Sequence, residues 1–90
     1  MRVQNFKSNN GNYVPNQFII NDDKNNLEYF QSYETIIAKI DWLNNKIYLD
    51  ENYWNYSRTT SVYRNKFLGI KIKEIKSKIK NNEIQLINLN

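Results

Sequence analysis

The sequence predicts an α+β fold, in which a small antiparallel β-sheet of three to five strands carries two short helices packed on one face. Two patterns predict this fold class. Apolar and polar residues alternate between about residues 27 and 50, whereas apolar residues recur every three or four positions between residues 58 and 80. Alternation is typical of half-buried strands, and the longer spacing is typical of amphipathic helices. A chain of 90 residues is long enough for one domain.

Three stretches alternate as strands do: Leu27–Ser32, Thr35–Asp41 and Lys46–Asp50. A short apolar run at residues 18–20 predicts a further strand at Gln17–Asn21. The segments 21–26 and 42–45 between them are rich in Asn and Asp, which favour turns because their side chains hydrogen-bond locally. The sequence therefore predicts antiparallel hairpins.

Face assignments follow from the alternation within the strands. In the stretch 35–41, Ile36, Ala38 and Ile40 are expected on one face and Ile37 on the other. The junction at residues 33–34 fits either a hairpin turn or a bulge in one long, bent strand.

The first predicted helix covers about residues 60–68. A cluster of hydroxyl residues at 57–61 offers several N-caps, of which we favour Thr59 or Thr60. Gly69 is expected to end this helix in a left-handed conformation.

A second helix follows, and its apolar stripe consists of Leu68, Ile72, Ile75 and Ile79. Asn81 and Asn82 are expected to stop it. Residues 83–89 alternate and are expected to return as a closing strand. The first twelve residues show no period, so we expect a flexible N-terminal arm at 1–12 and a single domain at 13–90.

The residues that most catalytic and metal sites require are missing. The chain has no cysteine and no histidine, which removes the commonest general base and the commonest metal ligands. The acidic pairs at 22–23 and 50–51 are interpreted as turn residues. We therefore expect no enzyme, no catalytic residue, no metal and no cofactor. No apolar run resembles a signal peptide or a membrane span, so a location in the cytoplasm is expected.

Charge divides the chain into two parts. Residues 1–57 contain five basic and seven acidic residues, a net charge of −2, whereas residues 58–80 contain eight basic and one acidic residue, a net charge of +7. Together with Glu83 this gives the total of +4. A basic region suits phosphate groups or an acidic protein surface, although lysines also simply keep a helix face soluble.

Aromatic residues lie beside these cations. Trp54, Tyr63 and Phe67 are assigned to the core, because large aromatics supply most of the burial in a small domain, and a surface on which bases stack is the alternative. The predicted binding surface combines the remaining aromatics with basic residues: Tyr53, Tyr56, Arg58, Arg64, Lys66, Lys73, Lys76 and Lys80. This mixture of residue types is common both in protein interfaces and in nucleic-acid sites.

Several blocks of the sequence together resemble a family of short phage-encoded proteins of unassigned function. These are YFQSYETIIA at residues 29–38, KIYLDENYWNYSRTTSVYRNKFLG at residues 46–69, and the closing NLN at residues 88–90. The resemblance implies a phage or prophage gene expressed in the cytoplasm of a bacterial host, and it implies no catalytic residue.

Three functions stay open. The first is a stoichiometric, anti-CRISPR-like inhibitor that binds a host defence or nuclease complex, by analogy with other small phage proteins. The others are a nucleic-acid-binding accessory protein and a structural or self-assembling phage component. In the first case the partner is a protein complex or the RNA or DNA that it holds.

Overall fold

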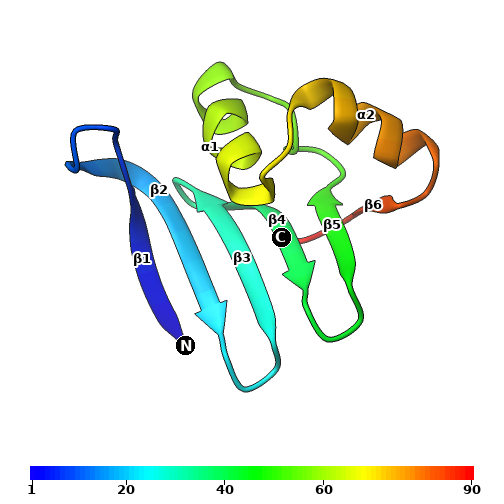
Figure 1. The fold of residues 1–90 in the computed structure, drawn as a ribbon, viewed down its shortest axis with the longest axis horizontal. Helices are drawn as coiled ribbons and strands as arrows, with labels where there is room; N and C mark the ends of the chain where they lie inside the picture. Colours follow the sequence, from blue (N-terminus) through cyan, green and yellow to red (C-terminus); the bar gives the residue numbers. More distant parts are fainter.

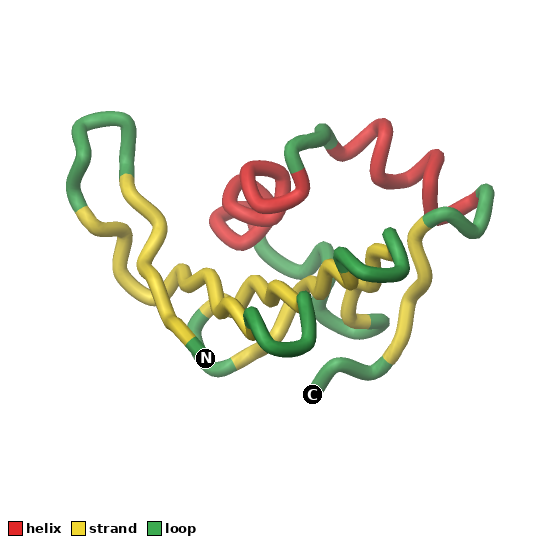
Figure 2. The backbone as a smooth tube through the Cα atoms, turned by 60° about the horizontal axis from the view of Figure 1, so that its bottom comes forward, coloured by secondary structure: helices red, strands yellow, loops and turns green.

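A computed structural model describes residues 1–90 and has an α+β fold (Figure 1). Its elements, in chain order, are β1 (Arg2–Lys7), β2 (Tyr13–Asp22), β3 (Leu27–Ser32), β4 (Thr35–Asp41), β5 (Lys46–Asp50), α1 (Arg58–Leu68), α2 (Ile72–Lys80) and β6 (Ile84–Ile87). All six strands form one sheet, and their order in the sheet follows their order in the chain. Figure 2 shows both helices on the same side of that sheet.

The expected fold class is therefore present, but the sheet is larger and of a different kind. Strands β1 to β5 are antiparallel neighbours, whereas β5 and β6 pair in parallel. The sheet is thus mixed and six-stranded, instead of antiparallel with three to five strands.

The helical crossover explains the parallel pair. The chain leaves the end of β5 at Asp50, and the two helices carry it back along the sheet, so that Ile84 enters β6 beside Ile47 near the start of β5. A parallel connection needs such a long crossover, commonly a helical one. Alternation at residues 83–89 indicates a strand but carries no information about its direction.

The N-terminal residues correct a second expectation. Order was expected to begin near Tyr13, but Arg2–Lys7 form strand β1 and pair with β2. Phe6 packs this strand against the core: the centre of its ring lies 5.6 Å from that of Phe30 and 5.3 Å from that of Tyr63. One aromatic residue among polar ones does not produce a periodic signal.

Strand β4 contains a bulge that changes the predicted faces. Phe30 pairs with Ala38 and Gln31 pairs with Ile36, which leaves Ile37 as the extra residue. Ile37 and Ala38 are both fully buried, and Ile36 is displaced to the face away from Phe30. Bulges re-aim side chains in this way. The junction at 33–34 is nevertheless a true turn, since Ser32 pairs with Thr35.

Helix α1 begins two residues earlier than predicted. Ser57 is the N-cap, and its side-chain oxygen accepts a hydrogen bond from the backbone N–H of Thr60 at 3.1 Å. Thr60, one of the two favoured caps, is buried inside the helix, where its hydroxyl shares a hydrogen bond of 2.8 Å with Ser32. Gly69 ends α1 with φ 72°, as predicted.

The core lies between the sheet and the helices. It consists of six buried apolar residues: Phe30, Ile37, Ala38, Leu49, Ile75 and Ile84. The aromatic residues assigned to the core from the sequence, Trp54, Tyr63 and Phe67, pack against this cluster. Ile75, from the predicted stripe of α2, is fully buried, which confirms the phase of that helix.

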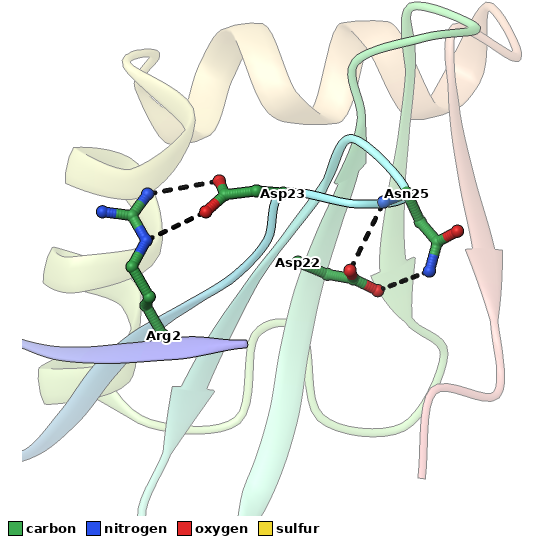
Figure 3. A network of polar contacts seen from close by, with 4 residues as sticks. All are labelled: Arg2, Asp22, Asp23 and Asn25. Carbon is green, nitrogen blue, oxygen red and sulfur yellow. Dashed lines mark hydrogen bonds and ion pairs between the residues drawn. The ribbon is translucent and has the colours of Figure 1, made fainter.

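Two hairpin ends are closed by side-chain hydrogen bonds, and Figure 3 shows one of them. Between β2 and β3, the carboxylate of Asp22 accepts hydrogen bonds from the backbone and side chain of Asn25. Arg2 of β1 reaches the same turn and forms an ion pair with Asp23 at 3.0 Å. Asp22 is the last residue of β2 and Asp23 the first of the turn, so the acidic pair closes the hairpin end and the interpretation as turn residues holds for Asp23.

Candidate functional site

The loop between β5 and α1 presents an exposed pair of tyrosines. Tyr53 is 42% exposed and Tyr56 48%, and their rings lie 5.6 Å apart at nearly a right angle. Asp50 fixes the start of this loop, because its carboxylate accepts hydrogen bonds from the N–H groups of Asn52 and Tyr53, both at 3.0 Å. Among the aromatics of this loop the sequence favoured these two for exposure, and both are exposed, whereas Trp54 is half-buried.

Arg64 does not belong to this surface, which corrects the prediction. Its side chain is fully buried and donates hydrogen bonds to the carbonyl of Trp54 at 2.8 Å and to Oδ1 of Asn55 at 3.0 Å. It also donates twice to Oδ1 of Asn65, at 2.9 and 3.2 Å. All these acceptors are neutral. Burial lowers the pKa of Arg64 because the charged form is partly desolvated.

Arg64 therefore acts as a brace inside the molecule. Its guanidinium carbon lies 5.4 Å from the centre of the Trp54 ring, so it holds the loop by stacking as well as by hydrogen bonds. It contacts Trp54 and Asn55, the two residues between Tyr53 and Tyr56, and so holds the loop that carries these tyrosines. The sequence did not reveal this role, because an arginine in a polar helix looks the same whether it points outwards or inwards.

The other predicted cations are exposed. Arg58 and Lys66 lie on α1, and Lys73, Lys76 and Lys80 lie on α2. The structure contains two ion pairs, Arg2 with Asp23 and Lys78 with Glu83, so none of these five cations has an acidic partner. Lys66 lies 5.1 Å from the Tyr63 ring centre. We call the exposed predicted residues the helical surface: Tyr53, Tyr56, Arg58, Lys66, Lys73, Lys76 and Lys80.

The helical surface is extended and does not form a pocket. α1 packs over β2 and β3, whereas α2 packs beside β6. The hollows of the molecule are lined by other residues, including one between the start of β5 and the end of α2 that Lys46, Lys78 and Glu83 line. A surface of this shape suits contact with a macromolecule better than capture of a small molecule.

The face of the sheet away from the helices is uncovered and forms a second candidate surface, whose central side chains are half-buried and which the sequence did not reveal. Across this face runs one row of paired residues: Val3, Ile20, Tyr29, Lys39, Tyr48 and Gln85. Tyr29, Lys39 and Tyr48 each neighbour a fully buried core residue in the chain, so alternation points them to the uncovered side.

Lys39 lies at the centre of this row. Its ammonium nitrogen is 5.4 Å from the ring centre of Tyr48 and 6.0 Å from that of Tyr29. It makes no ion pair. We call Tyr29, Lys39 and Tyr48 the open-face row. Each of these three residues lies in a strand that the sequence predicts. Only the register of the strands shows that the three side chains lie side by side.

These features define a small α+β protein with a sheet covered on one face by a basic helical layer. The chain belongs to a family of unknown function, DUF8033, whose model matches residues 1–85. No characterised protein and no solved structure shows a significant match to the sequence. No helix of the structure combines the length and the apolar character needed to cross a membrane.

Proposed function

We propose that this chain is a non-enzymatic, stoichiometric binding protein, which uses the helical surface to occupy an acidic surface of a larger host complex. The observation that carries the proposal is the set of exposed cations on α1 and α2 without acidic partners, together with the exposed Tyr53–Tyr56 pair in the loop that leads into α1. Tyrosine and arginine supply much of the affinity in protein interfaces, and unpaired lysines steer an acidic partner.

The resemblance to short phage-encoded proteins makes the proposal more specific. In this form the protein is carried by a phage or prophage, acts in the host cytoplasm and inhibits a host defence complex, as anti-CRISPR proteins do. The support is an analogy of gene context together with a basic, aromatic surface. Such a surface fits an acidic protein face or the nucleic acid of a nuclease complex, but it does not imitate DNA, which needs a dense negative charge.

Titration of purified protein into the cleavage reaction of a host CRISPR nuclease complex tests this function. We expect inhibition to be complete near one copy per complex. Tyr56→Ala or Arg58→Ala should weaken inhibition about thirtyfold, because a central interface side chain is commonly worth ~2 kcal/mol. Glu34→Ala, an exposed change at the turn between β3 and β4, serves as the control and should leave inhibition unchanged.

Two results would contradict the proposal. Absence of inhibition by an excess of folded protein rejects the inhibitor. Inhibition that persists far below one copy per complex requires turnover and therefore an active site, which the proposal excludes. Lys73→Gln and Lys76→Gln should slow association more than they speed dissociation, and the effect should shrink as salt is raised.

The open-face row favours a second candidate function, the binding of single-stranded nucleic acid. Tyrosine rings flanking a lysine on an uncovered sheet allow bases to stack while a phosphate is neutralised. Fluorescence anisotropy with a labelled oligonucleotide tests this. Tyr29→Leu and Tyr48→Leu should weaken binding. Lys39→Gln should reduce the slope of the logarithm of the binding constant against the logarithm of the salt concentration by about 1, because about one fewer counterion is released.

Tyr33 offers a matched control for this second candidate, because it is an exposed tyrosine in a turn outside the open-face row. Tyr33→Leu should leave oligonucleotide binding unchanged. If no binding is detected in the micromolar range even at low salt, nucleic-acid binding is rejected, and the inhibitor proposal is unaffected.

A further inference from the structure

The hairpin between β4 and β5 ends in two large apolar side chains that face solvent. Trp42 is 60% exposed and Leu43 is 74% exposed. A single exposed apolar residue is ordinary on protein surfaces. An adjacent, exposed Trp-Leu pair at the tip of a turn is less common on protein surfaces. Tryptophan in particular is enriched among the residues that contribute most to binding energy in protein interfaces.

The neighbouring hairpin provides an internal comparison, because both turns are built from the same pattern, Asp-x-x-Asn-Asn, at residues 22–26 and 41–45. Each aspartate accepts the backbone N–H of the first asparagine, at 3.3 Å in the first turn and 3.1 Å in the second. Each also accepts the side-chain amide of that asparagine, at 2.9 and 2.8 Å. The last asparagine is left-handed in both turns, with φ 55° and 53°.

The second and third positions of this pattern, at the tip of the turn, accept polar residues. In the first turn they are Asp23 and Lys24, and Asp23 forms the ion pair with Arg2 seen in Figure 3. In the second turn the same positions hold Trp42 and Leu43. The same turn thus forms with two charged tip residues, so the backbone does not require an apolar pair there. Folding alone leaves the Trp-Leu tip unexplained.

The tip is also held in a fixed conformation. The backbone N–H of Trp42 donates a hydrogen bond of 3.0 Å to the carbonyl of Asn26, which ties one hairpin end to the other. Hydrogen bonds from Asn44 to the carboxylate of Asp41 close the turn, and they hold the pKa of Asp41 below its usual range because they favour the charged form. A preformed loop loses less conformational entropy when it binds.

The charges around the two hairpin ends indicate what kind of partner fits. Three cations and four carboxylates belong to these ends: Arg2, Lys24, Lys46, Asp22, Asp23, Glu28 and Asp41. An anionic membrane or a phosphate backbone is bound through an excess of positive charge, which is absent here. An exposed apolar pair without surrounding positive charge fits an apolar pocket of a protein.

We propose that Trp42 and Leu43 form a preformed anchor that inserts into an apolar pocket on a protein partner. This deepens the proposed function and rests on it, because it takes the partner to be a protein. A second copy of the chain is a less suitable partner. Its most apolar hollow, between α2 and β6, is lined by Ile79, Ile84, Leu86 and Ile87, and a tip seated there makes a head-to-tail contact that tends to form open chains.

Site-specific photocrosslinking in host cells identifies what the tip contacts. A benzophenone side chain is placed at position 43, next to the intact Trp42, and in a control protein at position 24 of the matching turn. We expect one host protein to be crosslinked from position 43 and not from position 24. Equal crosslinking from both positions, crosslinking to a second copy of the chain, or no crosslinking overturns the anchor.

Affinity measurements with the purified crosslinked protein complete the test. Trp42→Ser should weaken binding at least about thirtyfold, as for a central interface residue, whereas Lys24→Ser should change it less than about threefold. Both variants should melt as the parent does, because both tips are exposed. Equal affinities of parent and Trp42→Ser overturn the anchor, as does Trp42-dependent binding to anionic phospholipid vesicles.

The outcome for the anchor is separable from that for the inhibitor. If Trp42→Ser inhibits the nuclease complex as strongly as the parent, the anchor is rejected and the inhibitor stands. If Trp42 is needed for binding to the crosslinked protein but no cleavage reaction is inhibited, the anchor stands and the inhibitor is rejected.

Discussion

At the scale of single residues, Asp50 connects distant parts of the chain. It is 1% exposed, and its carboxylate accepts hydrogen bonds from the N–H groups of Asn52, Tyr53 and Leu89 and from the side-chain amide of Asn90. Burial alone would raise the pKa of Asp50, but these donors outweigh it and hold the pKa below its usual range. One carboxylate thus fixes both the tyrosine loop and the end of the chain.

Asp50→Ala should lower the free energy of unfolding by about 3 kcal/mol, because four part-buried hydrogen bonds to an ionised acceptor are lost. Urea denaturation at neutral pH measures this. A loss below about 1 kcal/mol would mean that water replaces the carboxylate.

The lowered pKa of Asp50 also predicts how stability depends on pH. Since its folded-state pKa lies below the unfolded value of about 3.9, its contribution is present above that value and is lost as the pH falls through the folded-state pKa. Asp50→Asn should show a shallower decline in melting temperature below about pH 4 than the parent. Parallel acid profiles of the two proteins would contradict this assignment.

Arg64 is the second residue whose role is structural. Arg64→Ala should cost about 3 kcal/mol or more, because it empties a buried site and leaves the Trp54 carbonyl without its donor. Arg64→Lys should recover little of this loss, since an ammonium group does not reproduce the planar fork that reaches three acceptor groups. Urea denaturation of both variants checks this, and near-parental stability of Arg64→Ala would contradict the bracing role.

At the scale of elements, the start of α1 depends on one hydroxyl. Ser57 caps the helix, and both its side-chain and its main-chain oxygen accept hydrogen bonds from the first turn. Ser57→Ala should cost about 1 kcal/mol, the usual value of an N-cap. Thr59→Ala is the matched control, because Thr59 is exposed inside the helix, and it should cost less than about 0.5 kcal/mol. Thermal melts that rank the two variants in the opposite order would make Thr59 the cap.

At the scale of the whole molecule, the positive charge is concentrated in the helical layer. The acids among residues 58–83 are Glu74 and Glu83, and Glu83 pairs with Lys78. The other exposed lysines of α2 therefore repel one another, and like charges in one layer oppose compaction.

Added salt should therefore raise the melting temperature, because it screens this repulsion. We expect a smaller rise for the Lys73→Gln, Lys76→Gln double variant, in which part of the repulsion has been removed. Melting curves recorded over a series of sodium chloride concentrations test this. A melting temperature that falls with salt would show that attractive pairs dominate the surface.

Local patterns in the sequence were enough for most elements. The alternation at 27–32, 35–41 and 46–50 gave strands with the observed bounds, and the stripe through Ile75 placed α2 correctly. The predicted exposure of Tyr53 and Tyr56 is confirmed as well. All these features depend on neighbours close in the chain, which fix periodicity, turn chemistry and helix ends.

Long-range packing decided the rest. Phe6 brings β1 onto the sheet by packing against Phe30 and Tyr63, and the helical return makes β6 parallel to β5. The bulge at Ile37 is a matter of register with β3. None of these contacts can be predicted from a short segment of the sequence, because each depends on residues that are distant in the chain.

The candidate surfaces divide in the same way. The sequence by itself determined that the chain lacks histidine and cysteine, that its positive charge gathers between residues 58 and 80, and that aromatic residues lie beside that charge. Only the tertiary structure decided which of these side chains face solvent. It buried Arg64 among neutral acceptors, aligned Tyr29, Lys39 and Tyr48 across three strands, and left Trp42 exposed, because burial and register depend on packing between elements.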